Sequence, residues 1–88
     1  MKRKIYVGNL SYELTEGHIE ELFSDVGMVK EVKLARDPTN GASKGFAFVE
    51  FSTDEEASAA IAKYNNSDVA GKKLKIDYAK ERAKIKGR

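Results

Sequence analysis

The sequence predicts one α+β domain, in which four antiparallel strands form a sheet and two helices cover one of its faces. Four segments alternate apolar with polar residues, which is typical of strands that bury one face. Two other segments carry apolar residues at the spacing of a helix. Because these segments follow one another as strand, helix, strand, strand, helix and strand, the chain has the order βαββαβ.

The first strand is predicted over residues 4–9, where Ile5 and Val7 alternate with Lys4 and Tyr6. Successive side chains on a strand point to opposite faces. We therefore expect Ile5 and Val7 in the core, and Lys4 and Tyr6 on the opposite face.

The first helix is expected to begin after Thr15, whose hydroxyl can cap it, and to end at Gly27. Glu16 suits the first turn of such a helix. The residues at helical spacing that should face the core are Ile19, Leu22, Phe23 and Val26.

Two strands, residues 29–35 and 44–51, are expected to form a hairpin across the turn-forming residues 37–41. On the first of them Val32 and Leu34 face inward and Lys33 outward. On the second, the inward residues are Ala47, Val49 and Phe51. The outward residues are Lys44, Phe46, Phe48 and Glu50.

The last two predicted elements are the second helix and the fourth strand of the sheet. Residues 53–56 read Thr-Asp-Glu-Glu, a capping box that should begin the second helix. The inward residues of that helix are Ala57, Ala60, Ile61 and Tyr64. After a turn at Gly71, a strand is predicted over residues 73–78. It places Leu74, Ile76 and Tyr78 inward, and Lys75 and Asp77 outward.

Two helices can cover only one face of four strands, so the other face is left to solvent or to a ligand. Three aromatic residues and four lysines are expected there: Tyr6, Phe46, Phe48, Lys4, Lys33, Lys44 and Lys75. Aromatic rings edged by positive charge are what the stacking of unpaired bases requires. The alternative, that these rings belong to the core, is disfavoured because the opposite parity of each strand already provides a core face.

Acidic residues predominate in the two helical segments, and basic residues predominate in the rest of the chain. Segments 13–25 and 54–68, which contain the helices, carry a formal charge of −8, the rest of residues 1–79 carries +6, and residues 80–88 carry +4. A polyanion is therefore attracted to the strands and the end of the chain, and repelled by the helices. The preference of acidic residues for helix starts explains the negative charge of the helical segments. It does not explain the positive charge of the other residues.

Composition excludes several kinds of site. The chain has no cysteine and one histidine, His18, so it can form neither a disulfide nor a metal site of thiolates or several histidines. Its longest apolar stretch, residues 5–10, is too short for a signal peptide or a membrane span. We expect no metal, no cofactor, no membrane contact and a cytoplasmic location.

Two short sequence motifs resemble those of a known protein family. Residues 44–51 read Lys-Gly-Phe-Ala-Phe-Val-Glu-Phe and residues 5–10 read Ile-Tyr-Val-Gly-Asn-Leu. Residues 44–51 match the octamer signature of the RNA recognition motif (RRM) family, and residues 5–10 match its hexamer signature, at the spacing that the family has. The chain resembles this family over most of its length. The small single-domain RNA-binding proteins of bacteria and chloroplasts are similar. The resemblance implies a ferredoxin-like sandwich over residues 1–80, followed by a basic C-terminal tail, residues 81–88.

The resemblance also implies roles for single residues. Tyr6 and Phe48 would stack on neighbouring bases, Phe46 would contact the sugars between them, and Lys44 would pair with a phosphate. Asn9 would fix the turn after the first strand. From their outward positions, Lys75 would contact phosphates or bases and Asp77 would help to select a base. The RNA-binding residues expected are Lys4, Tyr6, Asn9, Lys33, Lys44, Phe46, Phe48, Lys75, Asp77 and Lys80.

The function that these features predict is the binding of single-stranded RNA, without catalysis, by a monomer. Two to four nucleotides would cross the sheet with little or modest sequence preference, and single-stranded DNA would bind more weakly. A protein-binding domain that uses the same face is the alternative. An acylphosphatase-like enzyme of this fold would need an arginine in the loop of residues 9–12, which has none. The tail is open to two interpretations, a solvated end or a phosphate-binding segment.

Overall fold

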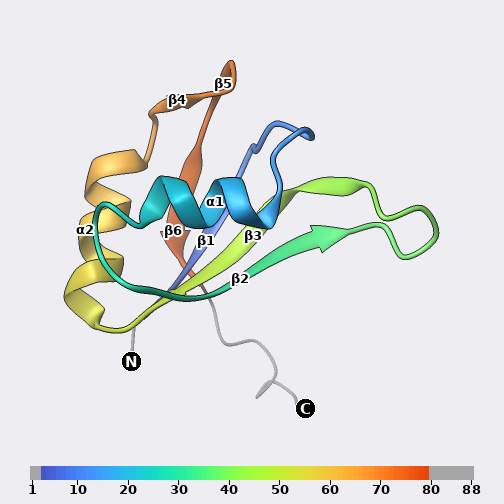
Figure 1. Cartoon of the computed structure of the whole chain (residues 1–88). Coiled ribbons are helices and arrows are strands. Elements are labelled where there is room, and N and C mark those ends of the chain that lie inside the picture. Colours follow the sequence, from blue (N-terminus) through green and yellow to red (C-terminus); the bar gives the residue numbers. More distant parts are fainter. Residues whose placement is uncertain (1–2, 80–88) are drawn as a thin grey trace, which may run out of the picture.

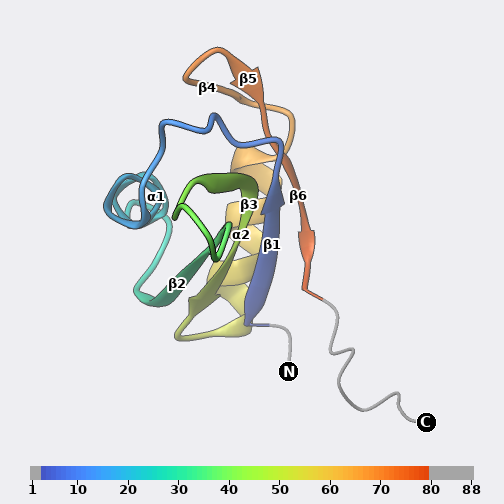
Figure 2. The same ribbon diagram turned by 90° about the vertical axis from the view of Figure 1, so that its right-hand side faces the viewer.

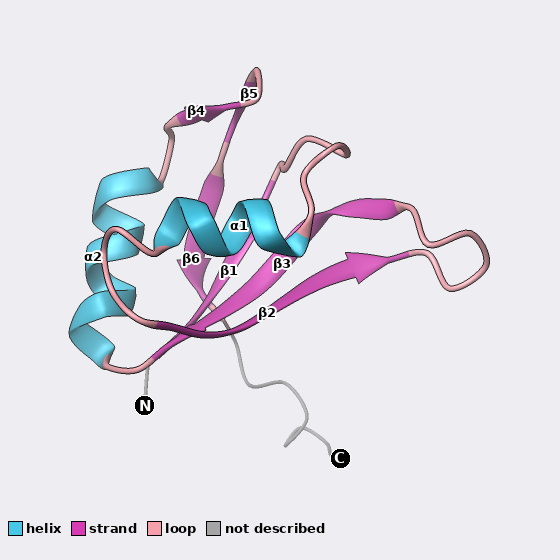
Figure 3. Cartoon of the chain, in the orientation of Figure 1, coloured by secondary structure: helices cyan, strands magenta, loops and turns pink. Residues whose placement is uncertain are grey.

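The structure, a computed structural model, describes residues 3–79 of the chain. Helices and strands follow one another as Figure 1 and Figure 3 show: β1 (Lys4–Gly8), α1 (Glu16–Phe23), β2 (Val29–Arg36), β3 (Ser43–Phe51), α2 (Asp54–Tyr64), β4 (Asp68–Val69), β5 (Lys72–Lys73) and β6 (Lys75–Tyr78).

Four of these strands form one antiparallel sheet in the order β2-β3-β1-β6. Both helices lie on the same side of it: α1 packs against β2, and α2 against β6, β3 and β1. Figure 2 shows α1 on the left, α2 behind β3 and β1, and no helix to the right of β1 and β6. The predicted ferredoxin-like arrangement, with two helices on one face, is confirmed.

The core lies between the sheet and the two helices. Ile5, Val7, Ala47, Val49 and Phe51 are fully buried, as their parity on the strands predicts. The helices contribute a second set of buried side chains, namely Ile19, Phe23, Ala57 and Ala60. The aromatic rings of the core meet edge to face, with 6.0 Å between the centroids of Phe23 and Phe51 and 5.3 Å between those of Phe23 and Tyr64.

Each helix begins at the predicted threonine, but the cap of α2 differs from the predicted capping box. The Thr15 hydroxyl accepts a hydrogen bond from the backbone N–H of His18, and the Thr15 N–H donates to His18 Nδ1. His18 therefore does the work of the acidic residue in a capping box. At α2 only half of the predicted box forms. Thr53 Oγ1 accepts from the Glu56 N–H, whereas the Glu56 carboxylate accepts from the N–H and hydroxyl of Ser52.

The predicted end of the first helix is wrong. Helix α1 stops at Phe23, four residues before Gly27, and Ser24 is its C-cap. The Ser24 hydroxyl donates to the Glu21 carbonyl oxygen at 2.8 Å, which satisfies one of the free acceptors at this end. Val26 consequently lies outside the helix, although it still packs against the core. Gly27 instead allows close packing, because an added Cβ would lie 2.5 Å from the Glu56 side chain.

The last predicted strand is divided in two. Strands β4 and β5 form a small separate hairpin, and β6 begins only at Lys75. The two residues of the hairpin turn, Ala70 and Gly71, both have positive φ, which a type I′ turn requires. Leu74 is fully buried between the hairpin and β6, as predicted.

Candidate nucleic-acid interface

Three aromatic rings stand together on the face of the sheet that no helix covers. Tyr6 comes from β1, and Phe46 and Phe48 come from the neighbouring strand β3. Tyr6 lies opposite Phe48 in the antiparallel register. The ring centroids are 5.9 Å apart for Tyr6 and Phe46, 5.7 Å for Tyr6 and Phe48, and 6.2 Å for Phe46 and Phe48. We call these three rings the aromatic platform.

The rings of the platform are partly exposed, unlike the aromatic residues of the core. Tilted and edge-to-face contacts among the three rings replace contact with a helix, and part of each ring stays open to solvent. Such a surface can accept flat, unpaired groups without first unfolding or moving a covering element.

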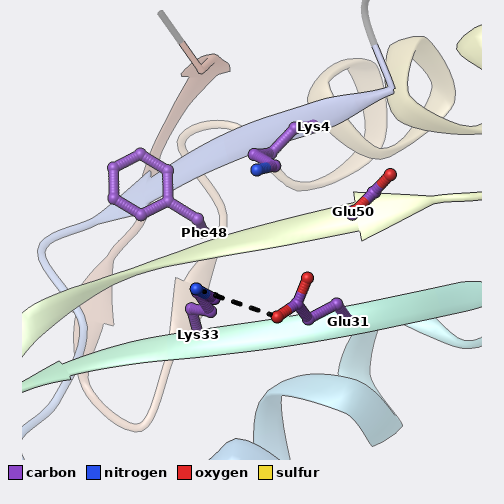
Figure 4. Close-up of a pocket in the computed structure, with 5 residues that line it drawn as sticks. All are labelled: Lys4, Glu31, Lys33, Phe48 and Glu50. Carbon is purple, nitrogen blue, oxygen red and sulfur yellow. Dashed lines mark ion pairs between the residues drawn. The ribbon is translucent and has the colours of Figure 1, made fainter. Parts of the chain in front are cut away.

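Two of the predicted lysines lie beside Phe48 of the platform, and two others are exposed on β3 and β6. Lys33 of β2 is opposite Phe48, and its side chain is 71% exposed. Lys4 of β1 lies beside Phe48 as well (Figure 4). Lys44 is exposed near the start of β3, and Lys75 is exposed on the edge strand β6, opposite Gly8. The Lys75 ammonium lies 3.4 Å from the side-chain oxygen of Asn66.

Two acidic residues of the same face were missing from the predicted site. Glu31 of β2 and Glu50 of β3 lie opposite each other, next to Phe48 (Figure 4). Strand parity was sufficient to find them, because Glu31 lies two residues before Lys33 and Glu50 two residues after Phe48.

The other predicted site residues have different surroundings. Asn9 has a φ of 59°, and its side-chain amide donates to the Lys73 carbonyl oxygen at 2.7 Å. This bond ties the loop after β1 to the segment before β6, which agrees with a role in fixing the turn. Asp77 lies opposite Tyr6 on β6, where its carboxylate accepts from the N–H of Tyr78. Lys80 lies outside the described residues.

One basic residue near the site is already paired. Arg36, at the end of β2, donates two hydrogen bonds to the Glu16 carboxylate, at 3.1 and 2.8 Å, and one to the Gly41 carbonyl oxygen. These bonds join the loop between β2 and β3 to helix α1. The hydrogen bonds from Arg36 lower the pKa of Glu16 to about 2, so the pair stays charged at neutral pH.

Residues 3–79 contain neither a cluster of metal ligands nor a membrane-spanning helix. No group of three or more histidine, cysteine, aspartate or glutamate side chains in that range could hold a metal ion. No helix in the same range is long and apolar enough to cross a membrane.

A helix-backed sheet whose open face carries aromatic rings and lysines belongs to the class of sheet-based nucleic-acid-binding folds. Comparison with known proteins identifies the family. The RNA recognition motif matches residues 5–75, and RbpD of Nostoc sp. (strain PCC 7120) is 44% identical over 78 residues, which are 89% of this chain and 83% of RbpD. The chain belongs to the RNA recognition motif family, and the predicted resemblance to small bacterial members is confirmed.

Larger proteins contain the same domain. Cleavage and termination factor 1 of Schizosaccharomyces pombe is 38% identical over 74 residues, but these are 84% of this chain and only 20% of that protein. Among solved structures, the RRM of Rna15 with bound RNA (GU) is 37% identical, with a TM-score of 0.82 over 90% of this chain and 84% of that one. This neighbour shows a closely similar fold in contact with RNA.

Proposed function

We propose that this protein binds single-stranded RNA through the aromatic platform, without catalysing a reaction. Tyr6 and Phe48 each stack on one base, Phe46 packs against the sugars between them, and the surrounding lysines pair with phosphates. Two to four nucleotides cross the sheet. Residues 1–80 form the binding domain in this proposal, and the basic residues 81–88 are a separate tail.

The observation that carries the proposal is the position of the three rings. They come from both signature motifs, lie within 6.2 Å of one another, and face away from both helices. Large aromatic side chains are normally buried in the core, so a cluster of them on an uncovered face beside lysines indicates a ligand with flat faces and negative charge. The RNA-bound neighbour with the same fold supports this choice of ligand.

A competition between unpaired RNA and an RNA stem of equal length tests the proposal. Bases within a duplex stack on each other and offer no free face to a flat sheet, so we expect the unpaired RNA to win. A Tyr6→Ala/Phe48→Ala double variant should lose this binding, whereas Met28→Ala, which removes an exposed apolar side chain elsewhere, should retain it. Equal affinity for stem and single strand would contradict binding by the platform.

The salt dependence of binding distinguishes RNA from a protein ligand on the same face. Binding to RNA releases counterions and weakens steeply as salt rises, whereas an apolar peptide would show little dependence. Single-stranded DNA of the same sequence, which lacks the 2′-hydroxyl, is expected to bind more weakly than RNA. The monomeric state and the cytoplasmic location stay predictions, which gel filtration and cell fractionation would test.

A further inference from the structure

Charged side chains of both signs surround Phe48. Lys33 lies opposite it on β2, and Lys4, Glu31 and Glu50 are next to it on three adjacent strands (Figure 4). Lysines are expected on a surface that binds a polyanion. Two carboxylates are not, because each repels phosphates and so weakens the binding of any nucleic acid that passes close by.

The carboxylates also repel each other. Glu31 and Glu50 are directly opposite on neighbouring strands, an arrangement that destabilises a sheet when both residues have the same charge. Two lysines offset this in part: Lys33 Nζ lies 4.0 Å from Glu31 Oε2, and Lys4 is directly opposite Glu50 on β1. Within residues 3–79, the Glu50 carboxylate forms no hydrogen bond or ion pair. Its oxygens are thus free to accept hydrogen bonds from a ligand.

The size of the space between these side chains limits what can enter it. The hollow lined by Lys4, Glu31, Lys33, Phe48 and Glu50 has a volume of about 10 Å³, which is close to that needed for one water molecule. This space matches a single small polar group, such as an amino group on the edge of a base stacked on Phe48, better than a whole ring.

The chemistry of the base edges then decides which base is favoured. Ionised carboxylates only accept hydrogen bonds. Cytosine and adenine each present an exocyclic amino group, and guanine presents one beside a ring N–H. Uracil has a single edge donor, flanked by two carbonyl oxygens that the carboxylates would repel.

We propose that Glu31 and Glu50 select the base on Phe48, and that they favour a base with an exocyclic amino group over uracil. This inference rests on the proposed binding of RNA by the platform. The neighbouring lysines offer donors for the ring nitrogen and carbonyl acceptors that accompany the amino group on cytosine and guanine edges.

Oligocytidine and oligouridine of equal length provide the test, because both bases are pyrimidines that differ only at position 4, amino or carbonyl, and at N3, acceptor or N–H donor. We expect the wild-type protein to bind oligocytidine about 5-fold to 20-fold more tightly, the lower part of the range for specific base contacts. In Glu31→Gln/Glu50→Gln this ratio should fall to about one, since glutamine offers both a donor and an acceptor.

The control is Glu21→Gln, which makes a charge change of the same sign on helix α1, on the covered side of the sheet. It should leave the ratio unchanged. If the double variant binds both oligomers more tightly by the same factor, the carboxylates only repel phosphates and the inference is wrong. A wild-type preference for oligouridine would also overturn it. If the wild-type protein binds neither oligomer, the proposed function itself fails.

Discussion

The ring of Tyr6 lies directly over Gly8. A Cβ added at Gly8 would be 2.6 Å from the Tyr6 hydroxyl oxygen and 2.8 Å from a ring carbon, closer than real Cβ atoms approach. Gly8 is two residues after Tyr6 on β1, so its open side faces the platform. The missing side chain therefore leaves the space that the end of the tyrosine ring occupies.

Gly8→Ala should displace the Tyr6 ring and weaken RNA binding without unfolding the domain. The clash involves the far end of one side chain, so the fold can accommodate the methyl group by moving the ring. We expect a loss of about 1–3 kcal/mol in binding, the contribution of one stacked base, and a change below about 1 kcal/mol in the free energy of unfolding. Fluorescence titration with unpaired RNA and urea unfolding would measure the two quantities.

The control for Gly8→Ala is the same change in a Tyr6→Ala background. If Gly8 acts only through the ring of Tyr6, the second substitution should cost nothing once the ring is gone. An equal loss in both backgrounds would show that Gly8 contacts RNA or supports β1 in another way.

Alanine substitutions of Phe48 and Phe51 should have opposite effects, the first on RNA binding and the second on the stability of the fold. Phe48 is partly exposed on the platform, whereas Phe51 is fully buried against Phe23. Phe48→Ala should weaken RNA binding by about 1–3 kcal/mol and have little effect on the free energy of unfolding. Phe51→Ala should lower that free energy by roughly 3–5 kcal/mol, because it leaves a cavity in the core.

Urea unfolding of both variants, with RNA titration of those that fold, makes the comparison. Unfolding of Phe48→Ala as severe as that of Phe51→Ala would mean that the assignment of the two faces of β3 is wrong.

The faces of β3 could be predicted because a strand has a period of two residues, and β3 keeps it without interruption from Gly45 to Phe51. Each inward residue of that stretch is buried and each outward one is not. The same reasoning is less reliable on β2. A register shift between Val29 and Glu31 lets Val29 pack against the core, although parity places it on the open face with Glu31.

Two features of the secondary structure, the end of the first helix and the β4–β5 hairpin, could not be predicted from the sequence. Gly27 resembles a helix stop, but its φ is not among the positive values, and its use is contact with Glu56 of α2. That contact joins segments far apart in the chain. The β4–β5 hairpin was missed because its strands have two residues each, too few for a periodic signal.

Register also limited the prediction of the site. Parity alone places Glu31 and Glu50 on the open face, but only the pairing of β2 with β3 shows that they lie opposite each other beside Phe48. Parity gives the face on which a residue lies, but not the offset between two strands, which depends on the turn that joins them and on any bulge. Which charges meet around a given ring is therefore a property of the folded sheet.

The Glu16–Arg36 pair should stabilise the fold at neutral pH and lose its effect in acid. Glu16 has a pKa of about 2 in the folded protein, lowered from 4.5 chiefly by the hydrogen bonds from Arg36. A carboxyl whose pKa is lowered on folding stabilises the protein above its unfolded pKa, and that stability is lost as pH falls from about 5 to about 2. Since both side chains are 40% or more exposed, we expect no more than about 1 kcal/mol.

Glu16→Gln isolates this contribution. The difference in the free energy of unfolding between wild type and variant should be present at pH 7 and much smaller at pH 2, where Glu16 is protonated in the unfolded chain and about half protonated in the folded one, because its folded pKa is about 2. Glu21→Gln on the same helix serves as the control for a change of charge. A difference between wild type and Glu16→Gln that persists unchanged at pH 2 would contradict the assignment.

The tail, residues 81–88, should add affinity for RNA without adding sequence preference. It contains four basic residues and no aromatic ring, so its contacts should be to phosphates, which carry no base identity. Each phosphate neutralised on a single strand contributes about 0.7 to the slope of log affinity against log salt. Deletion of residues 81–88 should therefore flatten the slope by roughly 1–3 units, and the order of preferred sequences should stay the same. An unchanged slope would show that the tail makes no contact with RNA, and a changed order that it reads bases.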